Sequence, residues 1–118
     1  MANSFKDLVV WQKSVELSLA IYKLTAKFPS SEQFGLTNQL RRASVSVASN
    51  IAEGFGKATK GENLQALGHA RGSNCEVETQ LVIADKLGFG AEAERREAAS
   101  LCDEIGRMLV VMMRGLRK

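Results

Sequence analysis

Apolar residues recur at three- and four-residue steps along four long stretches of the chain, which is the spacing of one face of an α-helix. The pattern predicts helices over about residues 7–27, 36–55, 61–87 and 91–116. The connections between them are a few residues each. Because short links between long helices force neighbours to run antiparallel, the sequence predicts an all-α, up-down-up-down four-helix bundle.

The first predicted helix is apolar on more than one side. Its main stripe consists of Leu8, Trp11, Val15, Leu19 and Tyr22. Further apolar residues lie off that stripe: Val9, Val10, Leu17, Ile21 and Leu24. Asp7 is the expected N-cap, and Phe28-Pro29 is expected to stop the helix. A helix that is apolar on two sides is expected to contact a second surface, such as another subunit.

Each of the other three predicted helices has one main apolar line. In chain order these lines are Leu36, Leu40, Ala43, Val47, Ile51 and Phe55, then Leu64, Leu67, Ala70, Val77, Leu81 and Ala84, then Ala98, Leu101, Ile105, Met108, Met112 and Leu116. Ser30 or Ser31 is expected to cap a short helical turn, which Gly35 separates from the long helix that follows. Gly88 is expected to end the third helix as its C-terminal glycine.

Size and composition fit a small globular protein. The chain has 118 residues, 45% hydrophobic and 25% charged, and we expect a single domain spanning residues 1–118. The N-terminus carries no signal-peptide pattern, and no apolar run approaches the length of a membrane span. We therefore expect a cytoplasmic protein with no membrane partner, in which Cys75 and Cys102 are two buried thiols rather than a disulfide.

The segment "GFGKATKG", residues 54–61, raises the question of a phosphate-binding loop. A dinucleotide loop requires G-x-G-x-x-G after a strand, and a Walker loop requires Lys and Ser or Thr after its second glycine. Neither spacing is present, and a predicted helix precedes the segment. We interpret Gly54 and Gly56 as the end of one helix and Gly61 as the start of the next. A second reading remains, in which Lys57 and Lys60 contact a phosphate near a helix N-terminus.

Several short motifs keep an order and spacing that resemble one known family. They are Asp7-Leu8, Val10-Trp11-Gln12, Ile21-Tyr22, Phe28-Pro29, Glu32, Phe34-Gly35-Leu36, Gln39, Arg41-Arg42-Ala43, Asn50-Ile51-Ala52-Glu53-Gly54, Gly72-Ser73 and Glu76. Nearly the whole chain resembles the four-helix-bundle family named after 23S rRNA intervening sequences. The chain departs from it at residue 57, which is often Arg in that family and is Lys here.

The resemblance implies an antiparallel bundle that forms ring-like homo-oligomers, with a pentamer as the expected form. The family has no established biochemical function, and RNA binding by its members is an inference. Related accessory proteins of diversity-generating retroelements share the bundle and bind nucleic acid. The resemblance therefore favours self-association and a nucleic-acid partner.

Polar residues form a line along the second and third predicted helices. Arg42, Ser46, Asn50, Glu53 and Lys57 follow one another at helical spacing, as do His69, Ser73, Glu76 and Gln80. If the two lines face each other, a buried polar network would form from Arg42, Asn50, Glu53, Ser73 and Glu76. Two solvated helix faces explain the same spacing equally well. Solvated faces leave the charges in water, whereas a buried network requires every charge to be paired.

No catalytic or metal-binding pattern emerges from these residues. A di-metal bundle needs Glu-x-x-His on two helices, whereas this chain has one histidine, His69, preceded three residues earlier by Ala66. No nucleophile motif surrounds His69, and the two cysteines lack zinc-ligand spacing. We expect no enzyme activity, no catalytic residues, no metal, no cofactor and no small-molecule substrate.

Basic residues are the remaining candidates for function. The net charge is +3, and the chain from Gly106 onward holds cations but no acid. The candidate nucleic-acid contacts are Arg41, Arg42, Lys57, Lys60, Arg71, Arg114 and Arg117. No aromatic residues alternate with them, so contacts to the phosphate backbone are expected. The leading hypothesis is a non-catalytic accessory protein that binds RNA or DNA, RNA before DNA; the alternative is a protein-interaction scaffold.

Overall fold

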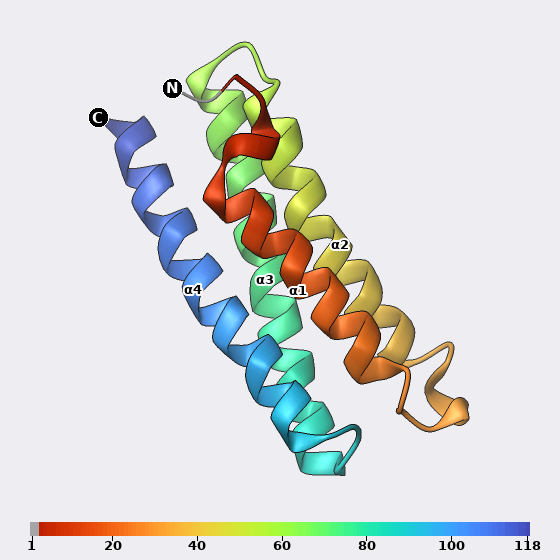
Figure 1. Cartoon of the computed structure of the whole chain (residues 1–118). Coiled ribbons are helices and arrows are strands. Elements are labelled where there is room, and N and C mark those ends of the chain that lie inside the picture. Colours follow the sequence, from red (N-terminus) through yellow and green to blue (C-terminus); the bar gives the residue numbers. More distant parts are fainter. Residues whose placement is uncertain (1–2) are drawn as a thin grey trace.

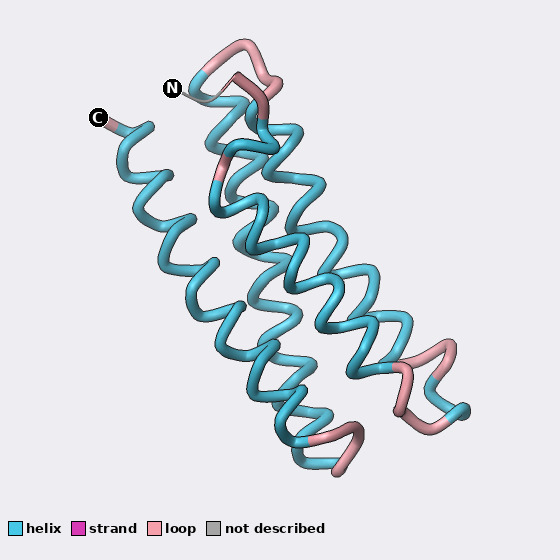
Figure 2. The backbone as a smooth tube through the Cα atoms, viewed as in Figure 1, coloured by secondary structure: helices cyan, strands magenta, loops and turns pink. Residues whose placement is uncertain are grey.

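The computed structural model describes residues 3–118, and every regular element in that range is helical. A short 3-10 helix, η1 (Phe5–Asp7), precedes α1 (Val9–Thr25), and a second, η2 (Ser30–Glu32), precedes α2 (Leu36–Phe55). The chain continues with α3 (Lys60–Leu87) and α4 (Glu92–Arg117). Figure 2 shows the four long helices joined by short connections, as the sequence predicts.

The four helices run alternately up and down in one elongated bundle of 44 × 23 × 21 Å. The α1–α2 and α3–α4 connections lie at one end, and the α2–α3 connection lies at the other end with both chain termini (Figure 1). Each helix packs against two neighbours, so that α1 and α3 each contact both α2 and α4. We call the end that holds the termini the α2–α3 end.

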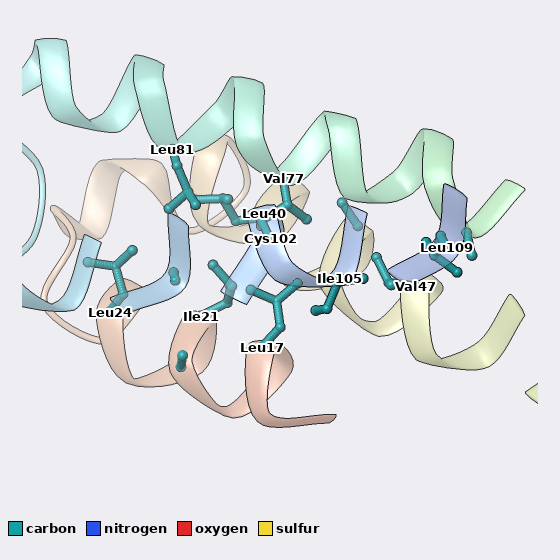
Figure 3. Packing of buried hydrophobic residues seen from close by; sticks show 14 of the residues in the cluster. Leu17, Ile21, Leu24, Leu40, Val47, Val77, Leu81, Cys102, Ile105 and Leu109 are labelled. Carbon is teal, nitrogen blue, oxygen red and sulfur yellow. The ribbon is translucent and has the colours of Figure 1, made fainter. Parts of the chain in front are cut away.

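A hydrophobic core runs along the axis of the bundle and receives side chains from all four helices. Figure 3 shows the cluster, whose labelled members include Leu17, Leu40, Val77, Ile105 and Leu109. Each of these five is fully buried. Burying one side chain of this size stabilises the fold by roughly 1.5–3 kcal/mol relative to leaving it exposed. The predicted apolar lines of the second, third and fourth helices all face this core or its edge, apart from Phe55, which is exposed.

The main apolar stripe predicted for α1 is not the buried face of the helix, although Leu8 and Trp11 pack against the edge of the core. Leu17, Ile21 and Leu24 are fully buried, whereas Leu19 is 66% exposed and Tyr22 is 46% exposed. The true core side was hidden in the sequence because it also carries polar residues, such as Ser14. The hydroxyl of Ser14 donates to the carbonyl of Val10 four residues earlier (2.7 Å), which makes its burial tolerable.

The helix ends follow local hydrogen-bonding rules with two departures from expectation. Thr59 caps α3, because its Oγ1 accepts from the backbone N–H of Glu62 (3.1 Å). Gly88 ends α3 with φ 73°, in the left-handed region that glycine favours. Asp7 does not cap α1, which begins after Leu8, and no serine side chain caps η2. Instead, Glu32 Oε1 accepts from the N–H of Leu36 (3.0 Å) at the start of α2.

The glycine-rich segment is a corner between two helices. Gly56 is the C-cap of α2, as predicted, and Gly61 is the second residue of α3. Gly54 does not end the helix but lies buried within it. A Cβ at this position would come 2.9 Å from Asn63 Oδ1 and 3.3 Å from Ala66 Cβ, so its missing side chain allows α2 and α3 to pack closely.

Candidate nucleic-acid interface

The seven predicted nucleic-acid contacts share one property in the structure. Within residues 3–118, none of them lies within 4.0 Å of a carboxylate oxygen. The cations that do form such pairs are Lys13, Lys23, Lys27, Arg95, Arg96 and Arg107. The candidate residues therefore form no direct ion pair in the described chain.

Two of the candidates lie on α2 at the groove between α1 and α2, where they have different surroundings. Arg41 Nε donates to Thr25 Oγ1 (2.9 Å), and its guanidinium lies 4.5 Å from the centre of the Tyr22 ring. Arg42 is exposed. Adjacent helix residues point about 100° apart, which explains why one arginine packs on α1 and the other faces solvent. Tyr22 could not be predicted as a neighbour of Arg41, because nothing in the sequence spacing pairs residues from these two helices.

A second groove lies between α3 and α4 and is lined by three arginines: Arg71, Arg107 and Arg114. Arg107 Nη2 pairs with Asp103 Oδ2 (2.8 Å), one turn away on the same helix. Arg71 and Arg114 are exposed. The sequence analysis placed Arg107 in the basic tail but not among the candidate contacts. The groove combines residues that are more than thirty positions apart in the chain, so spacing alone could not reveal it.

The remaining candidates gather at the α2–α3 end. Lys57 lies in the α2–α3 connection, Lys60 begins α3, and Arg117 is the last residue of α4. Figure 1 shows this connection and the C-terminus at the same end of the bundle. All three side chains are exposed. The fold thus places cations from two distant parts of the sequence at one end.

The predicted polar network is smaller than expected. The hydroxyls of Ser46 and Ser73 lie 3.0 Å apart across α2 and α3, and Asn50 Nδ2 donates to the carbonyl (2.8 Å) and hydroxyl (2.9 Å) of Ser46. The charged members, Arg42, Glu53 and Glu76, are exposed and form no ion pair within residues 3–118. Small hydroxyls fit between closely packed helices, whereas burying these charges would cost several kcal/mol.

The two cysteines have different environments. Cys102 is fully buried, and Cys75 is exposed on the α3–α4 groove, so the expectation of two buried thiols is wrong for Cys75. Burial raises the pKa of the Cys102 thiol to about 12, with smaller contributions from the negative charges of Glu78 and Cys75. At neutral pH Cys102 is therefore an uncharged, inaccessible thiol.

Residues 3–118 contain neither the cluster of His, Cys, Asp or Glu side chains that a metal site requires nor the long apolar helix that a membrane span requires. A polar groove near the α2–α3 end is lined by Glu53, Glu62 and His69, among others. No group of three or more His, Cys, Asp or Glu side chains in the described chain is placed to hold a metal ion. In the same range, no helix is both long enough and apolar enough to cross a membrane.

Fold and site together define a small four-helix bundle whose candidate functional groups are surface cations. The chain belongs to the 23S rRNA-intervening sequence protein family, whose model matches residues 6–111. This match confirms the resemblance seen in the sequence motifs. The family description names no catalytic activity.

The bundle is also similar to a crystal structure from Bacteroides thetaiotaomicron, described as a protein of unknown function from the S23 ribosomal protein family. The two chains are 21% identical and superpose with a TM-score of 0.80 over 89% of this chain and 98% of the other. This likeness shows the fold. No curated protein matches the chain.

Proposed function

We propose that this protein is a non-catalytic, cytoplasmic accessory protein that binds nucleic acid, RNA before DNA, through lysine and arginine contacts to phosphates. The observation that carries the proposal is the absence of ion-pair partners, within residues 3–118, for all seven candidate cations. An unpaired surface cation keeps its full attraction for a polyanion and releases counterions when a phosphate binds.

The order of RNA before DNA rests on the family description, which refers to 23S rRNA. The site chemistry itself is independent of sequence, because lysine and arginine contacts to phosphates position a nucleic acid without reading its bases. The aromatic ring beside Arg41, that of Tyr22, is covered on one face by the Arg41 guanidinium. Binding is therefore expected to depend on salt far more than on base sequence.

Self-association into a ring, with a pentamer as the expected form, is the second part of the proposal. Large apolar side chains are exposed on several elements: Leu19 (66%), Phe34 (89%) and Leu87 (57%). Exposed apolar surface of this kind is typical of protein–protein contact. Copies of one modest cationic surface around a ring axis would add to a larger positive field.

The first experiment is fluorescence anisotropy of labelled single- and double-stranded RNA and DNA across a salt series, with nuclease-treated protein. The affinity should fall linearly on a log–log salt plot, and Lys57→Ala/Lys60→Ala should reduce the slope by roughly 1.4–2. If no nucleic acid binds at the lowest salt concentration, the nucleic-acid proposal is wrong. Light scattering of the same samples gives the subunit count. A monomer at all concentrations would contradict the proposed ring.

A protein-interaction scaffold is the second candidate function, and Phe34 favours it. Phe34 is 89% exposed in the segment that precedes α2, at the opposite end of the bundle from the α2–α3 connection that holds Lys57. A scaffold would retain its partner when Lys57 and Lys60 are removed but lose it in Phe34→Ser. The two functions therefore separate on two variants that touch different surfaces.

A further inference from the structure

We propose that the phosphodiester backbone of the nucleic acid docks in the α3–α4 groove, with Arg71 and Arg114 as two of its phosphate contacts. This inference rests on the proposed function and assigns two of the seven candidates to one groove. Arg71 comes from the middle of α3 and Arg114 from the last turn of α4. They line the same groove, and neither has a carboxylate within 4.0 Å in residues 3–118.

The α3–α4 groove becomes more positively charged toward the α2–α3 end of the bundle. Its two carboxylates are Asp103, which Arg107 already neutralises at 2.8 Å, and Glu78, which lies further along α3 toward the α3–α4 connection. Beyond Gly106 the chain carries no acid up to its C-terminus. A polyanion is therefore attracted to the half of the groove that contains Arg71 and Arg114, and repelled at Glu78.

Two glycines of α3, Gly68 and Gly72, lie within three residues of Arg71, and close packing within residues 3–118 requires neither of them. A Cβ added at Gly72 would meet nothing within 4 Å, and one added at Gly68 would meet only Met113 Cε at 3.9 Å. Glycine in a helix interior costs roughly 0.5–1 kcal/mol relative to alanine. Both glycines thus lower helix stability while leaving the helix backbone next to Arg71 open to close approach.

Asn74 lies beneath the groove. It is 1% exposed, and its Nδ2 donates to the carbonyl of Cys102 (2.9 Å). Val110 and Val111 line the groove beside the arginines, so the lining combines apolar side chains with cations. The proposed contact is therefore carried by Arg71 and Arg114 and not by a polar floor.

The α1–α2 groove is the weaker competitor, although it also holds two arginines. Arg41 is already engaged by Thr25 Oγ1 and the Tyr22 ring, so a phosphate would have to displace those contacts. Within residues 3–118, neither Arg71 nor Arg114 makes a side-chain hydrogen bond or a cation–π contact of this kind. The α3–α4 groove therefore has two available cations and the α1–α2 groove has one.

The protein carries its own reporter for this groove. Cys75 is exposed and lines the groove, whereas Cys102 is buried and inaccessible. The measurement is the rate at which an uncharged thiol reagent, iodoacetamide, modifies Cys75 in the full-length protein, with and without a single-stranded RNA oligonucleotide. Cys75→Ser is the control that shows whether any signal comes from Cys102.

Saturating RNA at low salt should slow the modification of Cys75 at least fivefold, and high salt should restore the rate. In parallel, Arg71→Ala/Arg114→Ala should reduce the slope of the log–log salt plot by roughly 1.4–2, the value for two phosphate contacts. The matched control, Lys86→Ala/Arg96→Ala, removes the same charge from exposed residues near the α3–α4 connection and should leave that slope unchanged.

The possible failures separate the groove from the proposed function. If the wild-type protein binds RNA but Cys75 is not protected and Arg71→Ala/Arg114→Ala binds normally, the groove inference is overturned and the proposed function stands. If another subunit covers Cys75, the thiol will be unreactive even without RNA. That result also overturns the inference that nucleic acid docks in the α3–α4 groove. If no RNA binds, both proposals fall together.

Discussion

The guanidinium of Arg41 lies 4.5 Å from the centre of the Tyr22 ring and joins α2 to α1, while its neighbour Arg42 is exposed. Two adjacent arginines of the same motif thus have separate roles. One is a packing residue whose charge is partly used within the fold, and the other is available to a partner.

Arg41→Ala is expected to destabilise the fold by about 1–2 kcal/mol, because it removes a cation–π contact and the hydrogen bond to Thr25. Arg42→Ala is the matched control and should change the free energy of unfolding by less than about 0.5 kcal/mol. Urea unfolding of both variants measures the difference. Equal stability of the two variants would contradict the structural role of Arg41.

Gly54→Ala should destabilise the protein by roughly 1 kcal/mol, even though alanine is the better helix former. The added Cβ would lie 3.3 Å from Ala66 Cβ and 2.9 Å from Asn63 Oδ1, and overpacking at a helix contact outweighs the gain in propensity. Gly72→Ala, with open space around it, should instead raise the stability by about 0.5–1 kcal/mol. Thermal unfolding monitored by circular dichroism compares them, and a shift of both melting temperatures in the same direction would refute the packing argument.

Thr59→Ala is expected to cost about 1 kcal/mol, because it removes the side-chain acceptor at the start of α3. Thr79→Ala provides the control within the same helix. Thr79 is exposed, and its hydroxyl donates only to the carbonyl of Cys75 one turn earlier, so its loss should be within about 0.5 kcal/mol. Denaturant titrations of the two variants check the difference, and hydrogen exchange of the first turn of α3 shows whether the loss is local.

The stability of the fold should fall as the pH rises above about 9. The pKa of Cys102 is raised from 9.0 to about 12 in the folded state, so the unfolded chain loses this proton first. Between these two pKa values the folded state binds more protons than the unfolded state. The contribution of Cys102 to the free energy of unfolding therefore declines by about 1.36 kcal/mol per pH unit. Below pH 9 the contribution is fully present and independent of pH.

Unfolding measurements from pH 8 to 11 on the wild type and on Cys102→Ala test this effect. The variant loses some stability at every pH because a buried side chain is shortened, but its curve should be flatter than that of the wild type. Parallel curves would mean that another group causes the alkaline loss.

Much of the fold could be predicted because local rules and helical periodicity agree along most of the chain. The bounds of α2 and the end of α3 at Gly88 follow from spacing and glycine chemistry. The face of α1 could not be predicted in this way. Both sides of that helix have helical spacing, and the buried side includes Ser14, whose polarity is satisfied by the backbone of its own helix.

The candidate site was predictable as a set of residue types but not as a surface. Lysines and arginines stand out as a residue type in a basic chain, and the seven candidates form no ion pair within residues 3–118. The pairing of Arg41 with Tyr22, and the meeting of Arg71 with Arg114, depend on how separate helices pack. The charged members of the predicted network do not join it, because an exposed charge keeps its hydration and a buried one would lose it.

The sequence by itself determined the helices, their order and their antiparallel course, because these depend on periodicity, helix-ending glycines and short connections. Only the tertiary structure decided which face of α1 is buried, that Gly54 serves packing rather than helix termination, and which cations share a groove. Those outcomes depend on the shapes of side chains brought together from different helices, and no pattern within one helix contains that information.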